Sequence, residues 1–147
     1  MKRVFIIHRW DGDPTGDWRS WLRAELEQEG FIVHTPHMPE PSKPVIEKWV
    51  GHLAELVGEP DQDTYFVGHS IGAQTIMRYL LTINKPVGGA VFVAGWFKLE
   101  NLEYAEITEI AKPWIETPID PEKIKSVLPK STLLISDNDS YGCFEYN

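Results

Sequence analysis

One ten-residue stretch, residues 64–73, constrains the fold of this chain more than any other. In TYFVGHSIGA, a β-branched and aromatic run ends at a glycine, a serine follows two positions later, and a second glycine opens a helical segment. This is the G-x-S-x-G pattern of a nucleophile elbow, a sharp strand-to-helix turn that projects a serine above a sheet. Glycine is needed at Gly68 and Gly72 because side chains there would collide with the neighbouring strand or helix, and Ser70 must accept an uncommon backbone conformation.

The rest of the chain alternates between short apolar runs and amphipathic segments. Five continuous apolar runs predict buried parallel strands, at residues 4–7, 31–33, 64–67, 87–94 and 132–135. Apolar residues at helical spacing predict three helices, over residues 18–30, 45–57 and 72–83. Asp120 and Pro121 predict the start of a fourth helix that ends near Val127. Residues 36–44 hold four prolines and predict an extended loop, and residues 98–117 predict an excursion over the end of the sheet with room for short helices.

Strands that alternate with helices in this way predict a single α/β domain over residues 1–147. We expect a doubly wound parallel sheet of about five strands in the order 2-1-3-4-5, with helices on both faces. Ligands bind such sheets outside the carboxyl ends of the strands. Four groups of residues fall at such ends, namely residues 8–10, Ser70, residues 96–97, and Asp137 with Asp139. Their convergence predicts a functional site there.

The composition excludes several classes of function. The chain carries 14 basic and 22 acidic residues, a net charge of −8, and its basic residues are scattered, which argues against nucleic acid or an anionic membrane as a partner. A lone cysteine, Cys143, excludes a disulfide framework, and five histidines without paired spacing predict no metal site and no cofactor. No apolar run approaches about 18 residues, so we expect no signal peptide, no membrane span and a cytoplasmic location. A flavodoxin-like nucleotide binder would need a glycine-rich loop where residues 9–12, RWDG, stand instead.

Seven segments together resemble the small serine hydrolases of the α/β-hydrolase fold, and specifically the retinoblastoma-binding protein 9 family. They are residues 5–8, Trp18 with Trp21 and Leu22, and residues 38–41, 68–73, 91–95, 122–125 and 135–139. The resemblance covers essentially the whole chain. It implies a carboxylesterase or amidase that acts on a small acyl substrate, with Ser70 as nucleophile and Asp139 as the triad acid. The family often follows that acid with proline and an aromatic residue, where this chain has Ser140 and Tyr141.

The chain departs from the family pattern at two places. Arg9 stands where the family usually has a glycine beside the oxyanion hole, and an arginine there crowds the approach and adds charge. The family's catalytic histidine lies beyond the triad acid, but no histidine follows His69 here, so the order Ser, Asp, His is incomplete. We therefore expect a truncated fold without the family's last strand and helix, and severely reduced activity. The alternative is a catalytically impaired binding or protein-interaction module.

A serine nucleophile needs a base, an acid to orient that base, and donors for the oxyanion. The expected donors are the amide of Ile71 and an amide of the loop after the first strand, at Trp10 or Arg9. We assign His8, Trp96 and Phe97 to the substrate pocket. His8 is the only credible stand-in for the base, although a hydrogen-bonded histidine that shapes the loop is the favoured interpretation.

The remaining candidates have simpler interpretations. The side chain of His69 is expected to point away from Ser70, and His34, His37 and His52 are interpreted as surface or loop residues. Asp137 competes with Asp139 as the acid, but a turn role suits it better. Without a further strand the fifth strand becomes a sheet edge, so we expect self-association through that edge or marginal stability.

Overall fold

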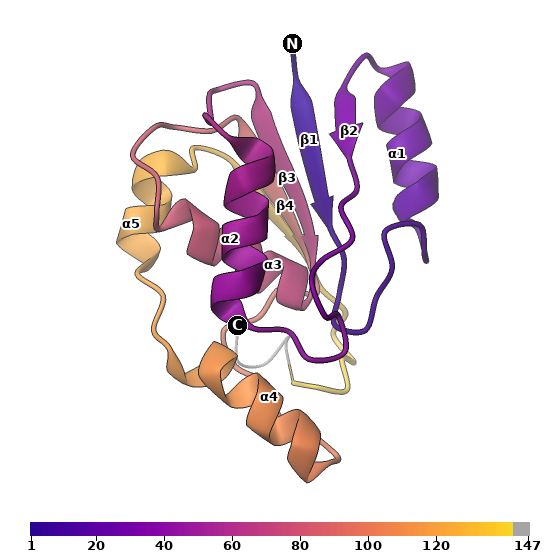
Figure 1. The fold of residues 1–147 in the computed structure, drawn as a ribbon, viewed down its shortest axis with the longest axis vertical. Helices are drawn as coiled ribbons and strands as arrows, with labels where there is room; N and C mark the ends of the chain where they lie inside the picture. The colour runs from indigo at the N-terminus through magenta and orange to yellow at the C-terminus, as the bar shows by residue number, and fades with distance from the viewer. Residues whose placement is uncertain (143–147) are drawn as a thin grey trace.

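Five parallel strands form the centre of the computed structural model, which describes residues 1–142 (Figure 1). They are β1 (Arg3–Ile7), β2 (Ile32–His34), β3 (Thr64–His69), β4 (Gly89–Val93) and β5 (Ser131–Leu134). Their spatial order is β2-β1-β3-β4-β5, with every neighbouring pair parallel, which confirms the predicted topology. Strand order reverses at β1 and β3, so a crevice is expected where these two strands end.

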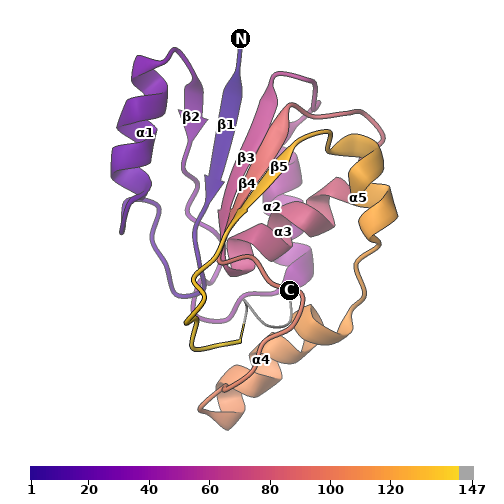
Figure 2. The ribbon, with the colours of Figure 1, turned by 180° about the vertical axis from the view of Figure 1, so that it is seen from behind.

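Helices cover both faces of the sheet and one end of it. They are α1 (Arg19–Gln28), α2 (Ile46–Val57), α3 (Ile71–Leu80), α4 (Ala105–Glu116) and α5 (Pro121–Val127). Helix α1 lies on one face, α2, α3 and α5 lie on the other, and α4 lies beyond the carboxyl ends of the strands (Figures 1 and 2). The predicted excursion thus contains one 12-residue helix, which includes Pro113. No helix within residues 1–142 is long and apolar enough to cross a membrane.

Local signals in the sequence explain where the helices begin and end. Asp120 accepts hydrogen bonds from the amides of Glu122 and Lys123, at 3.0 and 3.3 Å, and so caps α5 as predicted. Gly30 and Gly58 follow α1 and α2 with positive φ angles of 86° and 61°. These are positions where glycine is favoured because it has no side chain to clash with the backbone.

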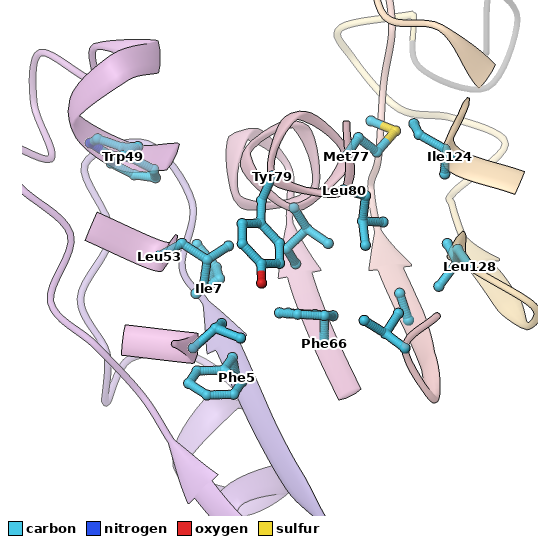
Figure 3. Packing of buried hydrophobic residues seen from close by; sticks show 14 of the residues in the cluster. Phe5, Ile7, Trp49, Leu53, Phe66, Met77, Tyr79, Leu80, Ile124 and Leu128 are labelled. Carbon is cyan, nitrogen blue, oxygen red and sulfur yellow. The ribbon is translucent and has the colours of Figure 1, made fainter. Parts of the chain in front are cut away.

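The larger core lies between the sheet and the layer of α2, α3 and α5 (Figure 3). Trp49 and Leu53 of α2 and Leu80 of α3 are fully buried there against side chains of β1 and β3. All ten residues of α3 are buried, because this helix lies at the centre of its layer. The smaller core, on the other face, joins Val4, Ile6, Val33 and Val67 to the apolar side of α1.

Tyr79 of α3 carries a buried hydroxyl that bonds to no partner within residues 1–142. Its ring packs on Phe66, and burial raises the pKa of the phenol to about 12. A buried donor without a partner costs about 1–3 kcal/mol. We expect Tyr79→Phe to raise the free energy of unfolding by roughly 1 kcal/mol, as measured by urea denaturation. A loss of 1 kcal/mol or more would show that the hydroxyl is bonded in solution.

One edge of the sheet is open in the described part of the chain. Within residues 1–142, β5 pairs with β4 alone, and Leu133 and Leu134 are 45% and 54% exposed. A hollow of about 630 Å³ lies on the α1 face between that helix and β3, β4 and β5, with an apolar lining that includes Trp21 and Val91. Its lining runs along β4 from Gly89 to Val93 and along β5 from Ser131 to Leu134. Self-association through the β5 edge stays a prediction, which light scattering on the purified chain would check.

Candidate active site

Ser70 sits in the sharp turn between β3 and α3. Its backbone has φ 52° and ψ −113°, a conformation that non-glycine residues rarely adopt. The Ser70 amide donates to the carbonyl of Val93 at 2.9 Å, and the Ser70 carbonyl accepts from Ala73 at 2.9 Å. These bonds anchor the strained turn to β4 and to the first turn of α3. A strained residue held by such bonds is a mark of a functional position.

The two flanking glycines let three backbone segments approach closely. A Cβ on Gly68 would lie 2.7 Å from the amide nitrogen of Ala73, and one on Gly72 would lie 2.3 Å from the carbonyl oxygen of Ile7. Both distances are far below van der Waals contact, which confirms the steric reason predicted for the glycines. The close approach at Gly72 also brings the N-terminus of α3 against the end of β1, where the first loop begins.

Ser70 opens into a cleft of about 360 Å³ at the carboxyl ends of the strands. This is the size of a pocket for a small organic ligand. The elbow and the loop after β1 supply its polar side, and the segment between β4 and α4 supplies an apolar wall. The lining comprises Arg9, Trp10, Asp11, His69, Ser70, Ala94, Leu99, Leu102, Ile107, Asp139 and Tyr141.

Asp139 and Ser70 line the same cleft, although they lie 69 positions apart in the sequence. The Asp139 carboxylate accepts a hydrogen bond from the amide of Tyr141 at 2.8 Å, and its amide donates to the carbonyl of Ser136 at 3.3 Å. Asp139 therefore stabilises the turn after β5 and is also one of the residues that line the cleft. Asp137 is exposed and is absent from the cleft lining.

The loop after β1 is fixed beside the elbow by the proline-rich segment. The indole of Trp10 donates to the carbonyl of Ser42 at 3.0 Å, and the amide of Asp11 donates to the carbonyl of Pro41 at 2.7 Å. Ile71 is the first residue of α3, so its amide has no acceptor within the helix. The structure thus places both predicted oxyanion donors, Ile71 and Trp10, on segments that meet at the mouth of the cleft. Arg9 lines the cleft as well, and its Nε lies 3.4 Å from the Asp17 carboxylate, with which it forms an ion pair.

His8 lies beneath this loop and outside the cleft. The ring is fully buried, Nε2 accepts from the amide of Met38 at 3.0 Å, and Nδ1 lies 2.8 Å from the carbonyl of Arg9. An amide can only donate and a carbonyl can only accept, so the proton is assigned to Nδ1 and the imidazole is neutral. With both ring nitrogens bonded to backbone, His8 shapes the loop, is absent from the lining of the cleft at Ser70, and has no ring nitrogen free to act as a base there.

The ring of His8 should also make the fold sensitive to acid. Burial lowers the pKa of His8, opposed by its bond to the Arg9 carbonyl, and burial likewise lowers the pKa of His69. The unfolded chain then binds more protons below the usual histidine pKa of about 6.5, so acid favours unfolding. We expect the free energy of unfolding to be flat above pH 7 and to fall between pH 6.5 and 5, as measured by urea denaturation. His8→Gln should flatten that slope, and equal stability at pH 7.5 and 5.5 would contradict the assignment.

His69 faces α1 and a buried arginine that sequence analysis did not single out. Its ring lies 5.7 Å from that of Trp18, and Nδ1 lies 3.5 Å from the guanidinium of Arg19. Arg19 in turn donates to the carbonyl of Asp13 at 2.6 and 3.0 Å and pairs with Asp17 at 3.2 Å. All five histidines lie within residues 1–142, and no hydrogen bond joins any of them to Ser70 Oγ.

Trp96 contacts Ser70 from the protein interior, and it is not among the residues that line the cleft. Its indole Nε1 donates to Ser70 Oγ at 3.2 Å, and the side chain is almost fully buried. Trp96 and Phe97 line a separate apolar cavity of about 210 Å³ between the sheet and α5. Of the three residues assigned to the substrate pocket, the structure therefore brings only Trp96 into contact with Ser70, and through its N–H group.

Two features of the site have no counterpart in the sequence prediction. Leu99, Leu102 and Ile107 form the apolar wall of the cleft, yet residues 98–117 show no clean hydrophobic period that would have marked them. The side chain of Gln74, which donates to the carbonyl of Trp96 at 2.9 Å, is a polar group inside a fully buried helix. Within residues 1–142, no three His, Cys, Asp or Glu side chains are grouped to hold a metal ion.

Comparison with known proteins gives consistent results. The profile of the family described as "Serine hydrolase" matches residues 4–146. The putative hydrolase YdeN of Bacillus subtilis is 34% identical over 149 residues, which cover 99% of this chain and 75% of YdeN. The serine hydrolase RBBP9 of Rattus norvegicus is 29% identical over 142 residues, which cover 95% of this chain and 73% of the relative.

Solved structures show the same architecture. The crystal structure of the ydeN gene product of B. subtilis superimposes with a TM-score of 0.88 and 26% identity, over 99% of this chain and 77% of that chain. An extracellular α/β-hydrolase from a Paenibacillus species superimposes with a TM-score of 0.63 over 95% of this chain and 79% of its own, at 13% identity. The second likeness concerns the fold alone. Together they establish the α/β-hydrolase architecture.

Proposed function

The chain belongs to the serine hydrolase family, and on that premise we propose that it is a carboxylesterase- or amidase-type hydrolase of a small acyl substrate. The observation that carries the proposal is the elbow. Ser70 holds a strained positive φ between two glycines that tolerate no Cβ, and it opens into a cleft of about 360 Å³. Strain of this kind is retained where function requires it.

In the proposed reaction Ser70 Oγ attacks the carbonyl carbon of an ester or amide. The amides of Ile71 and Trp10 would bind the oxyanion, because both belong to segments that meet beside Ser70. Asp139, which lines the same cleft as Ser70, would orient the base. The apolar wall of Leu99, Leu102 and Ile107 suits a short hydrocarbon acyl chain.

The base is proposed to be a histidine that lies outside this sequence. None of the five histidines of the chain bonds to Ser70 Oγ, and His8 has both ring nitrogens engaged by backbone. Without a base, a triad enzyme retains only the catalysis that its oxyanion hole and substrate binding supply. The 147 residues by themselves should therefore react slowly, by orders of magnitude compared with a complete triad.

The test is fluorophosphonate labelling together with p-nitrophenyl acetate turnover. The test compares three proteins, namely the unsubstituted chain, Ser70→Ala and the control Ser126→Ala, with and without imidazole as an external base. Ser126 is a suitable control because it lies in α5, away from the cleft. We expect slow labelling that imidazole accelerates in the chain and in Ser126→Ala, and no labelling in Ser70→Ala.

The same experiment separates the second candidate function. A binding or interaction module keeps the cleft but has no reactive serine, and the missing contact between a histidine and Ser70 Oγ favours it. Labelling that is absent from all three proteins, even with imidazole, would overturn the hydrolase proposal for this chain and support the binding module.

A further inference from the structure

The hydrogen bond between Trp96 and Ser70 has an unusual direction for a nucleophile. An indole N–H can only donate, so Ser70 Oγ is the acceptor of the 3.2 Å bond from Nε1. Within residues 1–142, this is the hydrogen bond that reaches Ser70 Oγ. The hydroxyl therefore keeps its own proton free to be donated to a base, while one lone pair already faces a fixed donor.

Three hydrogen bonds in a closed ring hold that donor in place. The backbone amide of Gln74 donates to the carbonyl of Ser70 at 3.3 Å, and the side-chain amide of Gln74 donates to the carbonyl of Trp96 at 2.9 Å. The indole of Trp96 closes the ring by donating to Ser70 Oγ. Gln74 and Trp96 are almost fully buried. Buried polar networks with every member bonded are rigid, so the indole N–H is preorganised toward Oγ.

We propose that Trp96 is a catalytic hydrogen-bond donor that stabilises negative charge on Ser70 Oγ, with Gln74 as its positioning residue. The inference rests on the proposed role of Ser70 as nucleophile. A hydrogen bond to an ionised oxygen is roughly twice as strong as one to a neutral oxygen. The bond is therefore stronger in the transition state than in the resting enzyme, which is the condition for it to accelerate the reaction.

The same donor assists both halves of the reaction. In acylation the Oγ–H bond breaks, the base takes the proton, Oγ bonds to the acyl carbon, and the leaving alcohol or amine departs with that proton. In the acyl-enzyme Oγ is an ester oxygen, a weaker acceptor, and the bond to Trp96 relaxes. When water attacks the acyl carbon and loses a proton to the base, the bond from carbon to Oγ breaks, and charge returns to Oγ before it regains a proton. Trp96 then stabilises the departing oxygen.

The test replaces the N–H group without changing the shape of the ring. In Trp96→benzothienylalanine, introduced at that single position, a sulfur atom stands where the N–H was. We expect the second-order rate of fluorophosphonate labelling to fall roughly 10- to 100-fold, the loss typical of a hydrogen bond to a charged group. Gln74→Met should lower the rate in the same direction, because the carbonyl of Trp96 loses its donor.

Trp114 offers a matched control. Its buried indole donates to the carbonyl of Pro44 at 3.0 Å, away from Ser70. Trp114→benzothienylalanine should lower the free energy of unfolding by about as much as the Trp96 replacement does, and it should leave the labelling rate unchanged. Equal labelling rates for the Trp96 and Trp114 replacements would overturn the inference while the proposed function stands.

A spectroscopic readout tests the bond independently of reactivity. The indole ¹H–¹⁵N signal of Trp96, assigned with Trp96→Phe, should move when Ser70 is replaced in Ser70→Ala, whereas the Trp114 signal should not. Absence of labelling in the unsubstituted chain would overturn the proposed function and the catalytic role of Trp96 with it, and the indole signal would then decide only whether the hydrogen bond from Trp96 to Ser70 exists. A Trp96 signal that is identical in the chain and in Ser70→Ala would overturn the inference in either case.

Discussion

Gly72→Ala should destabilise this chain by at least about 3 kcal/mol, a large part of the stability of an ordinary domain. The added Cβ would lie 2.3 Å from the carbonyl oxygen of Ile7 and 2.8 Å from that of His8. Both atoms belong to the backbone, so no side-chain rotation can relieve the clash. The N-terminus of α3 must instead move away from β1, which breaks the register of the elbow. Urea denaturation of the variant and the parent chain measures the loss.

Gly51→Ala is the matched control for this prediction. Gly51 lies in α2, and a Cβ built on it meets nothing within 4 Å. Alanine there should raise the free energy of unfolding by roughly 0.5–1 kcal/mol, since it restricts the unfolded chain and favours the helix. If the two glycine substitutions had similar effects, the close approach of α3 to β1 would not exist in solution.

The clash also connects stability to the site. Gly72 follows Ile71 and lies against the carbonyls of Ile7 and His8, where the chain enters the loop that carries Trp10. A shift of α3 separates these two donors, so a folded fraction of Gly72→Ala should bind an oxyanion poorly. Fluorophosphonate labelling should therefore fall by more than the population of folded protein does.

Steric signals of this kind explain why the elbow could be predicted from the sequence. The pattern of Gly68, Ser70 and Gly72 is local, because it lies within ten adjacent residues, although the backbone that Gly72 approaches belongs to β1. The doubly wound parallel sheet followed from alternating elements and the handedness of crossovers, and the order 2-1-3-4-5 is one of the two common orders for such a sheet. The cap at Asp120 was equally local, and its two bonds are present as expected.

Contacts between distant segments could not be predicted in this way. The partner of His8 depends on where the proline-rich loop places the amide of Met38, which no periodicity encodes. The bond from Trp96 to Ser70 likewise depends on the path of the chain after β4. As an aromatic residue in a loop, Trp96 was predicted to form a pocket wall, whereas in the structure its indole N–H donates to Ser70 Oγ.

Buried cations were missed for a different reason. A charged residue in an amphipathic pattern is normally interpreted as part of the exposed face, and Arg19 and Arg78 are both buried. Helix α3 has no exposed face among its ten residues, so Arg78 had to find acceptors inside the protein. The four-residue spacing of Gln74 and Arg78 was the available signal, because it places both polar groups on one side of the helix.

Arg78→Met should destabilise the chain by roughly 3 kcal/mol, because it removes a buried fork of donors and leaves their acceptors behind. Arg78 donates through Nε to the side-chain oxygen of Gln74 at 2.9 Å, and through a terminal nitrogen to the carbonyls of Trp114 and Thr117 at 2.8 and 2.9 Å. The two carbonyls lie at the C-terminal end of α4, where a cation is favoured by the helix dipole. Methionine has similar length but no donor, so all three oxygens lose their partner.

Arg23→Met controls for the loss of an arginine that is not buried. Arg23 pairs with Glu27 one turn along α1 at 2.8 Å, and its side chain is 48% exposed. Loss of such a surface pair should cost no more than about 0.5 kcal/mol. Arg78→Lys should lie between the two methionine variants, since an ammonium keeps the charge but cannot reproduce the planar fork. Equal effects of Arg78→Met and Arg23→Met would contradict the buried network.

A double-mutant cycle with Gln74→Met decides whether Arg78 acts on the site through Gln74. Both side chains belong to one line of hydrogen bonds that runs from α4 through α3 to Trp96 and ends at Ser70. If that line acts as a unit, Gln74→Met already removes one acceptor of Arg78. The loss in free energy of unfolding of the double variant should then be at least about 0.5 kcal/mol smaller than the sum of the losses of the two single variants. The rate of fluorophosphonate labelling of Ser70 should then fall in Arg78→Met even under conditions where the variant is fully folded, because Gln74 no longer has a partner that fixes its side chain. Strict additivity would mean that Arg78 only joins α3 to α4, and that the orientation of Trp96 is set by Gln74 alone.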